Sequence, residues 1–94
     1  MTVLFSPEAE ADLLAALDYI RERNSGAVLK LAERVFSTLE QLASEPIDGP
    51  EHTLTTGELV RGWPIRPFRI YYQRRSDAIY VLRVYHHARR PIVK

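Results

Sequence analysis

The sequence predicts an α+β fold, in which a hairpin of two helices packs on a small, mainly antiparallel sheet in the order β-α-α-β-β-β. Three observations lead to this prediction. The first half of the chain carries two helical patterns of apolar residues, and the second half is rich in β-branched and aromatic residues. The length of 94 residues suits one compact domain. We therefore expect a single domain over residues 1–94.

The opening of the chain predicts a strand followed by a helix. Residues 2–5 are a short apolar run, expected to form the strand. Ser6 and Pro7 come next, and serine at the cap with proline at the first helical position is a typical helix start. Apolar residues at spacings of four and three mark the buried side of this helix: Leu13, Leu17 and Ile20. The break at residues 24–26 (Asn-Ser-Gly) is expected to end it.

A second helical pattern follows directly. Its apolar positions recur every three or four residues on one face: Val28, Leu31, Val35, Leu39 and Leu42. Pro46 and the Gly49–Pro50 pair stop the helix. Because the link between the two helices is short, we expect an antiparallel helical hairpin.

The rest of the chain predicts a three-stranded meander. We expect strands over residues 59–63, 66–74 and 79–85, with a turn near Ser76 and Asp77. Residues 46–58 are expected to form the one substantial loop.

Strand alternation predicts which side chains share a face of this meander. Ile70 and Tyr72 are expected to point to the helices with Tyr80, Leu82 and Val84. A three-residue turn over residues 76–78 keeps the two apolar sets on one face. In that register, five pairs lie opposite one another: Arg75 and Ile79, Tyr72 and Leu82, Tyr71 and Arg83, Ile70 and Val84, Arg69 and Tyr85. The sequence thus predicts an arginine–tyrosine quartet, Arg69, Tyr71, Arg83 and Tyr85, on the sheet face away from the helices.

The composition excludes several kinds of site. The chain has no cysteine, which rules out disulfides and sulfur-ligated metals. His86 and His87 are adjacent in an expected strand, so their side chains point in opposite directions, and His52 offers no clear third ligand. We expect no metal and no cofactor. The chain shows neither a leader-like start nor an apolar run of about 20 residues, so a cytoplasmic protein is expected.

Charge is unevenly distributed along the chain. Residues 1–50 hold nine acidic and four basic side chains, whereas residues 51–94 hold three acidic and nine basic ones. This separation favours an anionic partner, either nucleic acid or an acidic polypeptide. The alternative is that the two halves neutralise each other within the fold.

Two blocks of the second half, FRIYY and VLRVYHHAR, carry a family resemblance together with the opening VLFSPEAEADL. The chain resembles the ParE branch of the RelE/ParE superfamily, toxins of type II toxin–antitoxin modules. The resemblance implies a toxin that poisons DNA gyrase, blocks replication and is neutralised by a ParD-like antitoxin in a hetero-oligomer. RelE-like members of the same fold instead cut messenger RNA in the ribosome.

The residues bear on this choice. For RNA cleavage, Arg69, Arg83 and Arg89 could surround the phosphate, and His87 could act as base or acid. However, the middle strands have no lysine, and no tyrosine or histidine follows residue 90. The sequence therefore favours a toxin without a catalytic site of its own. A ribosome-dependent ribonuclease and a weakly toxic binding module of the same fold remain alternatives.

The binding residues are predicted in two groups. An acidic, amphipathic antitoxin segment suits the positive sheet face, and its expected contacts are these: Trp63, Arg69, Tyr71, Arg83 and Tyr85. The expected contacts with the cellular target are His87, Arg89 and Arg90. His86 continues the apolar face of the last strand and is expected to have a structural role.

Overall fold

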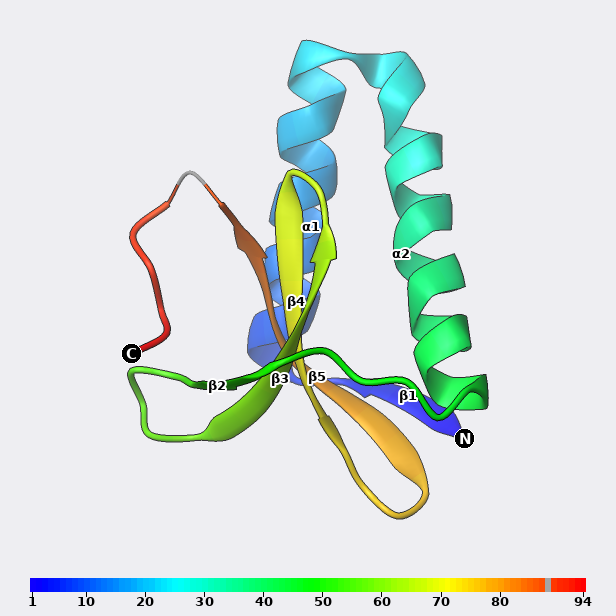
Figure 1. Cartoon of the computed structure of the whole chain (residues 1–94). Coiled ribbons are helices and arrows are strands. Elements are labelled where there is room, and N and C mark those ends of the chain that lie inside the picture. The colour runs from blue at the N-terminus through cyan, green and yellow to red at the C-terminus, as the bar shows by residue number, and fades with distance from the viewer. Residues whose placement is uncertain (88) are drawn as a thin grey trace.

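The computed structural model describes residues 1–87 and 89–94. The elements follow in this order: β1 (Thr2–Phe5), α1 (Pro7–Arg23), the 3-10 turn η1 (Ser25–Ala27), α2 (Val28–Ser44), β2 (Glu51–Thr53), β3 (Leu59–Ile65), β4 (Phe68–Arg74) and β5 (Ala78–His86). One five-stranded sheet has the order β1-β5-β4-β3-β2, with β1 and β5 parallel and the other pairs antiparallel. The helices run side by side as a hairpin (Figure 1). The predicted α+β class is confirmed.

The main core lies between the helical hairpin and the sheet. The predicted face of α2 is buried through Leu31, Val35, Leu39 and Leu42, and the predicted stripe of α1 is half-buried against the same cluster. The sheet contributes residues from β3, β4 and β5: Ile65, Phe68, Ile70, Tyr72, Ile79, Val81 and Val84. Apolar burial on this scale is what fixes the helices on one face of the sheet.

Ser6 joins β1 to α1 and attaches both to β5. Its Oγ accepts the Ala9 N–H at 3.0 Å, as predicted for the helix cap, and donates to the Leu82 carbonyl at 2.8 Å. At the other end of α1, Asn24 terminates the helix, and its side chain accepts the Gly26 N–H at 3.1 Å. The predicted start and end of this helix are both confirmed.

The pairing of β4 with β5 differs from the predicted register. Arg75 and Ala78 close a two-residue turn, not a three-residue one, through Arg75 N–H to Ala78 O at 2.8 Å. A β-bulge between Tyr71 and Tyr72 then inserts one extra residue, Leu82, into β5. Three predicted pairs are confirmed: Ile70–Val84, Arg69–Tyr85 and Tyr71–Arg83. The pairs Arg75–Ile79 and Tyr72–Leu82 are wrong, since Arg74 faces Ile79 and Tyr72 faces Val81.

The two-residue turn exchanges the faces of the first part of β5, up to the bulge. Ile79 and Val81 belong to the core beneath the helices, whereas Tyr80 and Leu82 pack on the opposite side. The predicted helix-facing positions of Tyr80 and Leu82 are therefore wrong, and that of Val84 is confirmed. With the two-residue turn and no bulge, Arg83 and Tyr85 would point to the helices and Val84 away from them. The extra residue of the bulge restores the predicted alternation from Arg83 onward.

The segment expected to be a loop, residues 46–58, contains a further strand. Strand β2 pairs with β3, and Leu54 forms an isolated antiparallel bridge with Val93. Strand β3 also continues past Trp63 to Ile65, and β4 begins at Phe68 rather than at Arg66.

A second, smaller core covers the sheet face away from the helices. Its buried members are Leu54, Val60, Tyr71 and Leu82, with Tyr80, Tyr85, Ile92 and Val93 packed against them. Residues 89–94, called the strap below, return from β5 toward the β2–β3 hairpin to complete this core (Figure 1). The face predicted to be open is thus partly covered by the chain itself.

Candidate functional site

The arginine–tyrosine quartet lies on one sheet face, as its register requires. Arg69 stands opposite Tyr85, and Tyr71 stands opposite Arg83. Tyr71, however, is only 6% exposed. Burial is the main cause of its raised pKa, with the Arg69 charge acting in the opposite direction. Tyr71 therefore forms the floor of the second core, and its contact with an antitoxin stays a prediction.

Arg83 is held by the first helix. Its Nε donates to Asp12 Oδ2 at 2.7 Å and its Nη2 donates to Asp12 Oδ1 at 3.2 Å, a two-point contact with one carboxylate. This hydrogen bonding raises the pKa of Arg83 above its usual value. The guanidinium also lies 5.6 Å from the centre of the Tyr85 ring. Arg83 thus links α1 to β5, a role that exists without any partner.

Tyr85 and Arg69 occupy the other end of the quartet. The Tyr85 hydroxyl donates to the Arg90 carbonyl and so fixes the start of the strap. The stem of Arg69 passes over Gly62, where an added Cβ would stand 3.3 Å from Arg69 Cδ and 2.9 Å from the His52 ring. Glycine at position 62 leaves the space that both side chains need.

Trp63 is separated from the quartet. It pairs with Ile70 across β3 and β4 and packs, half-buried, against the main core under the helices. The five predicted antitoxin contacts therefore do not form one continuous surface. Any antitoxin that touches all of them has to reach both sides of the sheet.

A basic cluster forms where the β3–β4 turn meets the end of β5. The His87 N–H donates to the Pro67 carbonyl at 3.1 Å, which holds the end of β5 against this turn. The side chain of His87 is exposed, and its pKa is lowered first by slight desolvation and then by the charges of Arg69 and Arg66. Arg34 of α2 joins them by donating to the Arg66 carbonyl at 2.9 Å. We call Arg34, Arg66, Arg69 and His87 the basic cluster.

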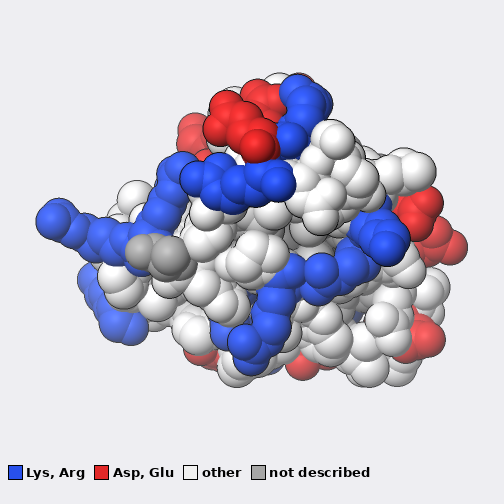
Figure 2. Space-filling view, turned by 90° about the horizontal axis from the view of Figure 1, so that it is seen from above, with Lys and Arg blue, Asp and Glu red and all other residues white. Residues whose placement is uncertain are grey.

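The arginines at this end of the molecule have no carboxylate partner among the residues that the structure describes. Within residues 1–87 and 89–94, no Asp or Glu oxygen lies within 4.0 Å of the charged nitrogens of Arg34, Arg66 or Arg69, and the same holds for the exposed Arg89 and Arg90. Figure 2 shows Lys and Arg side chains crossing this end of the molecule, with Asp and Glu mainly at its margins. Unpaired cations grouped in this way attract an anionic partner.

His86 differs from His87 in its surroundings. Its ring packs edge-on against Tyr19 at 5.2 Å and against Phe68 at 5.0 Å between centroids. These contacts accord with the structural role expected for it.

Sequence reasoning missed two members of the basic cluster. Arg66 precedes the proline of a tight turn, a signal that could have placed its side chain at the end of the sheet. Arg34 gave no such signal, because its position depends on how α2 crosses the sheet. Among the described residues, no three His, Asp or Glu side chains are grouped as a metal would require. None of the described helices is long and apolar enough to cross a membrane.

Comparisons with known proteins agree with this architecture. The sequence model of the family described as "ParE toxin of type II toxin-antitoxin system, parDE" matches residues 3–91. A solved chain of the chromosomal ParDE system from P. aeruginosa superposes with a TM-score of 0.64 at 21% identity, over 92% of this chain and 95% of that one. Among curated proteins, none matches the sequence. The family match covers nearly the whole chain, which therefore belongs to the ParE toxin family of type II toxin–antitoxin systems.

Proposed function

We propose that this protein is the toxin of a type II module that acts in the cytoplasm, poisons DNA gyrase and thereby blocks replication, and that a ParD-like antitoxin neutralises it. The observation that carries the proposal is the match of residues 3–91 to the ParE family. The P. aeruginosa neighbour, itself part of a ParDE system, supports the same fold.

The charge distribution supports a poisoning mechanism based on binding. The basic cluster, together with Arg89 and Arg90, presents cations at one end of the molecule, and in the described part of the chain none of them has a carboxylate partner. Gyrase with cleaved DNA offers phosphates that such cations bind. A toxin that stabilises this complex needs no chemistry of its own. His87, Arg89 and Arg90 are the target contacts in this proposal, now joined by Arg66 and Arg69.

The test uses purified protein, DNA gyrase, ATP and supercoiled plasmid, followed by detergent and protease. Linear DNA that disappears when the antitoxin is added is the expected result. Plasmid that stays intact, with a protein preparation whose expression stops the growth of cells, would contradict gyrase poisoning.

A second candidate function, cleavage of ribosome-bound messenger RNA, is favoured by one specific observation. His87 has a lowered pKa beside Arg66 and Arg69, so a neutral imidazole stands next to two cations. Such a pair of features suits a base beside a phosphate-binding group. Incubation of programmed ribosomes with the protein, followed by mapping of the message ends, tests it. Cleavage that is lost in His87→Gln and Arg69→Gln would favour the ribonuclease, and an intact message would reject it.

A further inference from the structure

The strap fills an apolar site on the sheet with its own side chains. Ile92 and Val93 pack against the buried Leu54, Val60, Tyr71 and Leu82, the floor of the second core. They share the covering of this floor with Tyr80 and Tyr85. The strap thus shows by its own contacts which chemistry the site accepts, namely aliphatic side chains.

The strap also satisfies the outer edge of the sheet. Val93 lies opposite Leu54 in an antiparallel bridge. The Thr55 N–H donates to the Ile92 carbonyl at 2.7 Å, and the Lys94 N–H donates to the Thr53 carbonyl at 2.8 Å. Residues 92–94 therefore lie beside residues 53–55 through one antiparallel bridge and two backbone hydrogen bonds. An edge of this kind is the usual docking place for an extended peptide.

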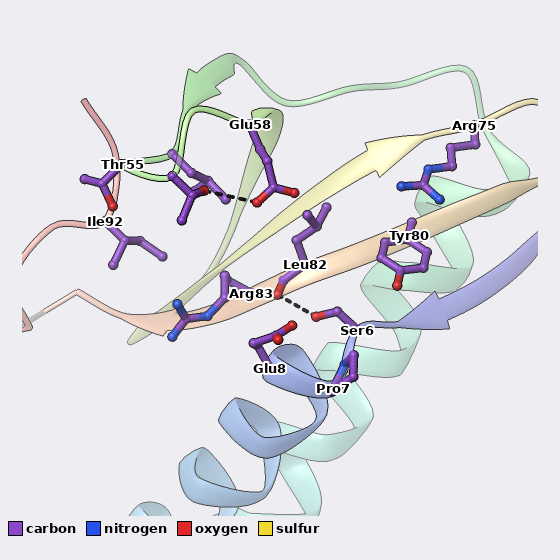
Figure 3. A pocket seen from close by; sticks show the side chains of 12 residues that line it. Ser6, Pro7, Glu8, Thr55, Glu58, Arg75, Tyr80, Leu82, Arg83 and Ile92 are labelled. Atoms are coloured by element: carbon purple, nitrogen blue, oxygen red, sulfur yellow. Dashed lines mark hydrogen bonds between the residues drawn. The ribbon is translucent and has the colours of Figure 1, made fainter.

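The strap does not fill the whole hollow. A pocket of about 440 Å3 continues from Ile92 between the start of α1, the face of β5 and the β2–β3 hairpin (Figure 3). Tyr80 and Leu82 are among the residues that line it, as is Arg75, whose guanidinium lies 4.3 Å from the centre of the Tyr80 ring. Arg75 has no carboxylate within 4.0 Å among the described residues. Glu8 and Glu58 also line the pocket, so an acidic residue of a longer segment would fit only at the end that holds Arg75.

The attachment of the strap is slight. Among the described residues, its two half-buried side chains are accompanied by two backbone hydrogen bonds at residues 53–55, one from the Arg89 N–H to the His86 carbonyl at 3.1 Å, and the bond from Tyr85 to the Arg90 carbonyl. Its other side chains, Arg89, Arg90, Pro91 and Lys94, are exposed. A segment of another chain that makes the same hydrogen bonds, and also contacts the pocket, would bind this site more tightly than the strap does.

We propose that the strap occupies the site at which an extended segment of the antitoxin binds. This segment would displace residues 91–94, pair with the edge at residues 53–55, place two aliphatic side chains over Tyr71 and Leu82, and direct an acidic side chain to Arg75. The inference rests on the proposed function, because it takes the antitoxin as the partner. The antitoxin segment and the strap then compete for one site, and the antitoxin binds more weakly than it would to a chain whose strap is open.

A disulfide lock tests the competition. The chain has no cysteine, and Leu54 and Val93 face each other as an antiparallel pair, so the variant Leu54→Cys/Val93→Cys can close one bond across the strap. Titration calorimetry with the cognate antitoxin compares the oxidised and reduced forms of the same protein. We expect oxidation to weaken binding about tenfold or more, since the antitoxin can no longer displace the strap. Equal affinity in both forms would overturn the proposal.

The matched control is a lock that leaves the strap free. Glu51 and Arg61 pair across β2 and β3, which stay together in the proposal, so oxidation of Glu51→Cys/Arg61→Cys should leave the affinity unchanged. A disulfide-linked dimer of the strap variant on a non-reducing gel would assign the site to the strap of a second copy and overturn the antitoxin as occupant. If the unmodified protein and the reduced variant bind no antitoxin, the proposed function itself fails.

Hydrogen exchange gives a second test on the unmodified protein. The Lys94 amide should exchange faster when antitoxin is added, because its bond to Thr53 is lost, whereas the Thr55 amide should stay protected by its new partner. Slower exchange at Lys94 in the complex would contradict displacement, even if the cysteine variants failed to fold.

Discussion

Asp12 of α1 satisfies the edge of β5 beyond the point where β1 ends. Its carboxylate accepts the Val84 N–H at 3.0 Å as well as the Arg83 guanidinium at 2.7 Å. Strand β1 pairs with β5 only as far as Val81, and the side chain of Ser6 takes over at the Leu82 carbonyl. Beyond the end of β1, the side chains of Ser6 and Asp12 therefore form the hydrogen bonds to β5 that an edge strand would otherwise form. They pair backbone groups that would lack a partner without them.

We predict that Asp12→Ala destabilises the protein by about 2–3 kcal/mol, because the Val84 N–H and the half-buried Arg83 lose their partner together. Urea unfolding followed by circular dichroism measures the free energy. The control is Asp18→Ala on the same helix, which removes an exposed pair with Arg21 and should cost about 0.5 kcal/mol or less. Equal losses in the two variants would show that the contact with β5 adds nothing.

The parts of the fold that depend on residues close together in the sequence could be predicted from it. Ser6 and Pro7 set the start of α1, Asn24 its end, and the apolar spacing of α2 its buried face. The bulge opposite Tyr71 and Tyr72 could not be placed in advance. Its position depends on how the two faces of β5 pack against different cores, and an alternating apolar strand fits either face.

The candidate site was predictable to a smaller extent. The pairs Arg69–Tyr85 and Tyr71–Arg83 followed from alternation, but their coverage by residues 92–94 did not. The bridge between Leu54 and Val93 joins segments that are far apart in the chain, and the single residues involved carry no pattern of their own. Asp12 likewise looked like any acidic residue in the first turns of a helix.

The loop after α2 is fastened by Tyr72. The hydroxyl of this buried residue donates to Asp48 at 3.0 Å and accepts the Gly49 N–H at 2.9 Å. We predict that Tyr72→Phe costs about 1–2 kcal/mol, since the Gly49 N–H is left without a partner. Tyr80→Phe is the control, because the Tyr80 hydroxyl has no hydrogen bond to any described residue. A thermal melt that is unchanged in Tyr72→Phe would contradict this role.

Gly49 lies too close to β3 to carry a side chain. A Cβ at this position would stand 1.8 Å from the Gly62 carbonyl oxygen, a backbone atom that cannot move away alone. We predict that Gly49→Ala costs about 3 kcal/mol through displacement of the backbone. Gly26→Ala, where the nearest atom is 3.4 Å away, should change stability little. Denaturant midpoints of the two variants compare them directly, and similar midpoints would refute the close contact.

The pKa of His87 reports on the basic cluster. Because Arg69 lowers this pKa, Arg69→Gln should raise it, whereas Arg21→Gln should leave it as it was. Proton NMR of the imidazole as a function of pH measures both. With a folded pKa below the usual 6.5, the contribution of His87 to stability is complete above about pH 6.5 and decreases as the pH falls through the folded value. An unchanged His87 pKa in Arg69→Gln would show that the Arg69 charge does not act on His87.

The two arginines at the start of the strap provide the direct test of target contact. Arg89 and Arg90 are exposed and have no carboxylate partner among the described residues, so their replacement by alanine should leave the fold intact. We predict that Arg89→Ala/Arg90→Ala lowers the yield of linear DNA in the gyrase reaction about tenfold at fixed toxin concentration, because two phosphate contacts are lost. Antitoxin affinity should stay the same, since Arg89 and Arg90 lie outside residues 91–94, which the antitoxin segment displaces, and outside the edge at residues 53–55 with which it pairs. The control, Arg21→Ala/Arg23→Ala, removes the same charge from the end of α1 and should poison gyrase as the unmodified protein does. A similar loss in both double variants would mean that net charge, not the position of Arg89 and Arg90, governs the encounter with gyrase.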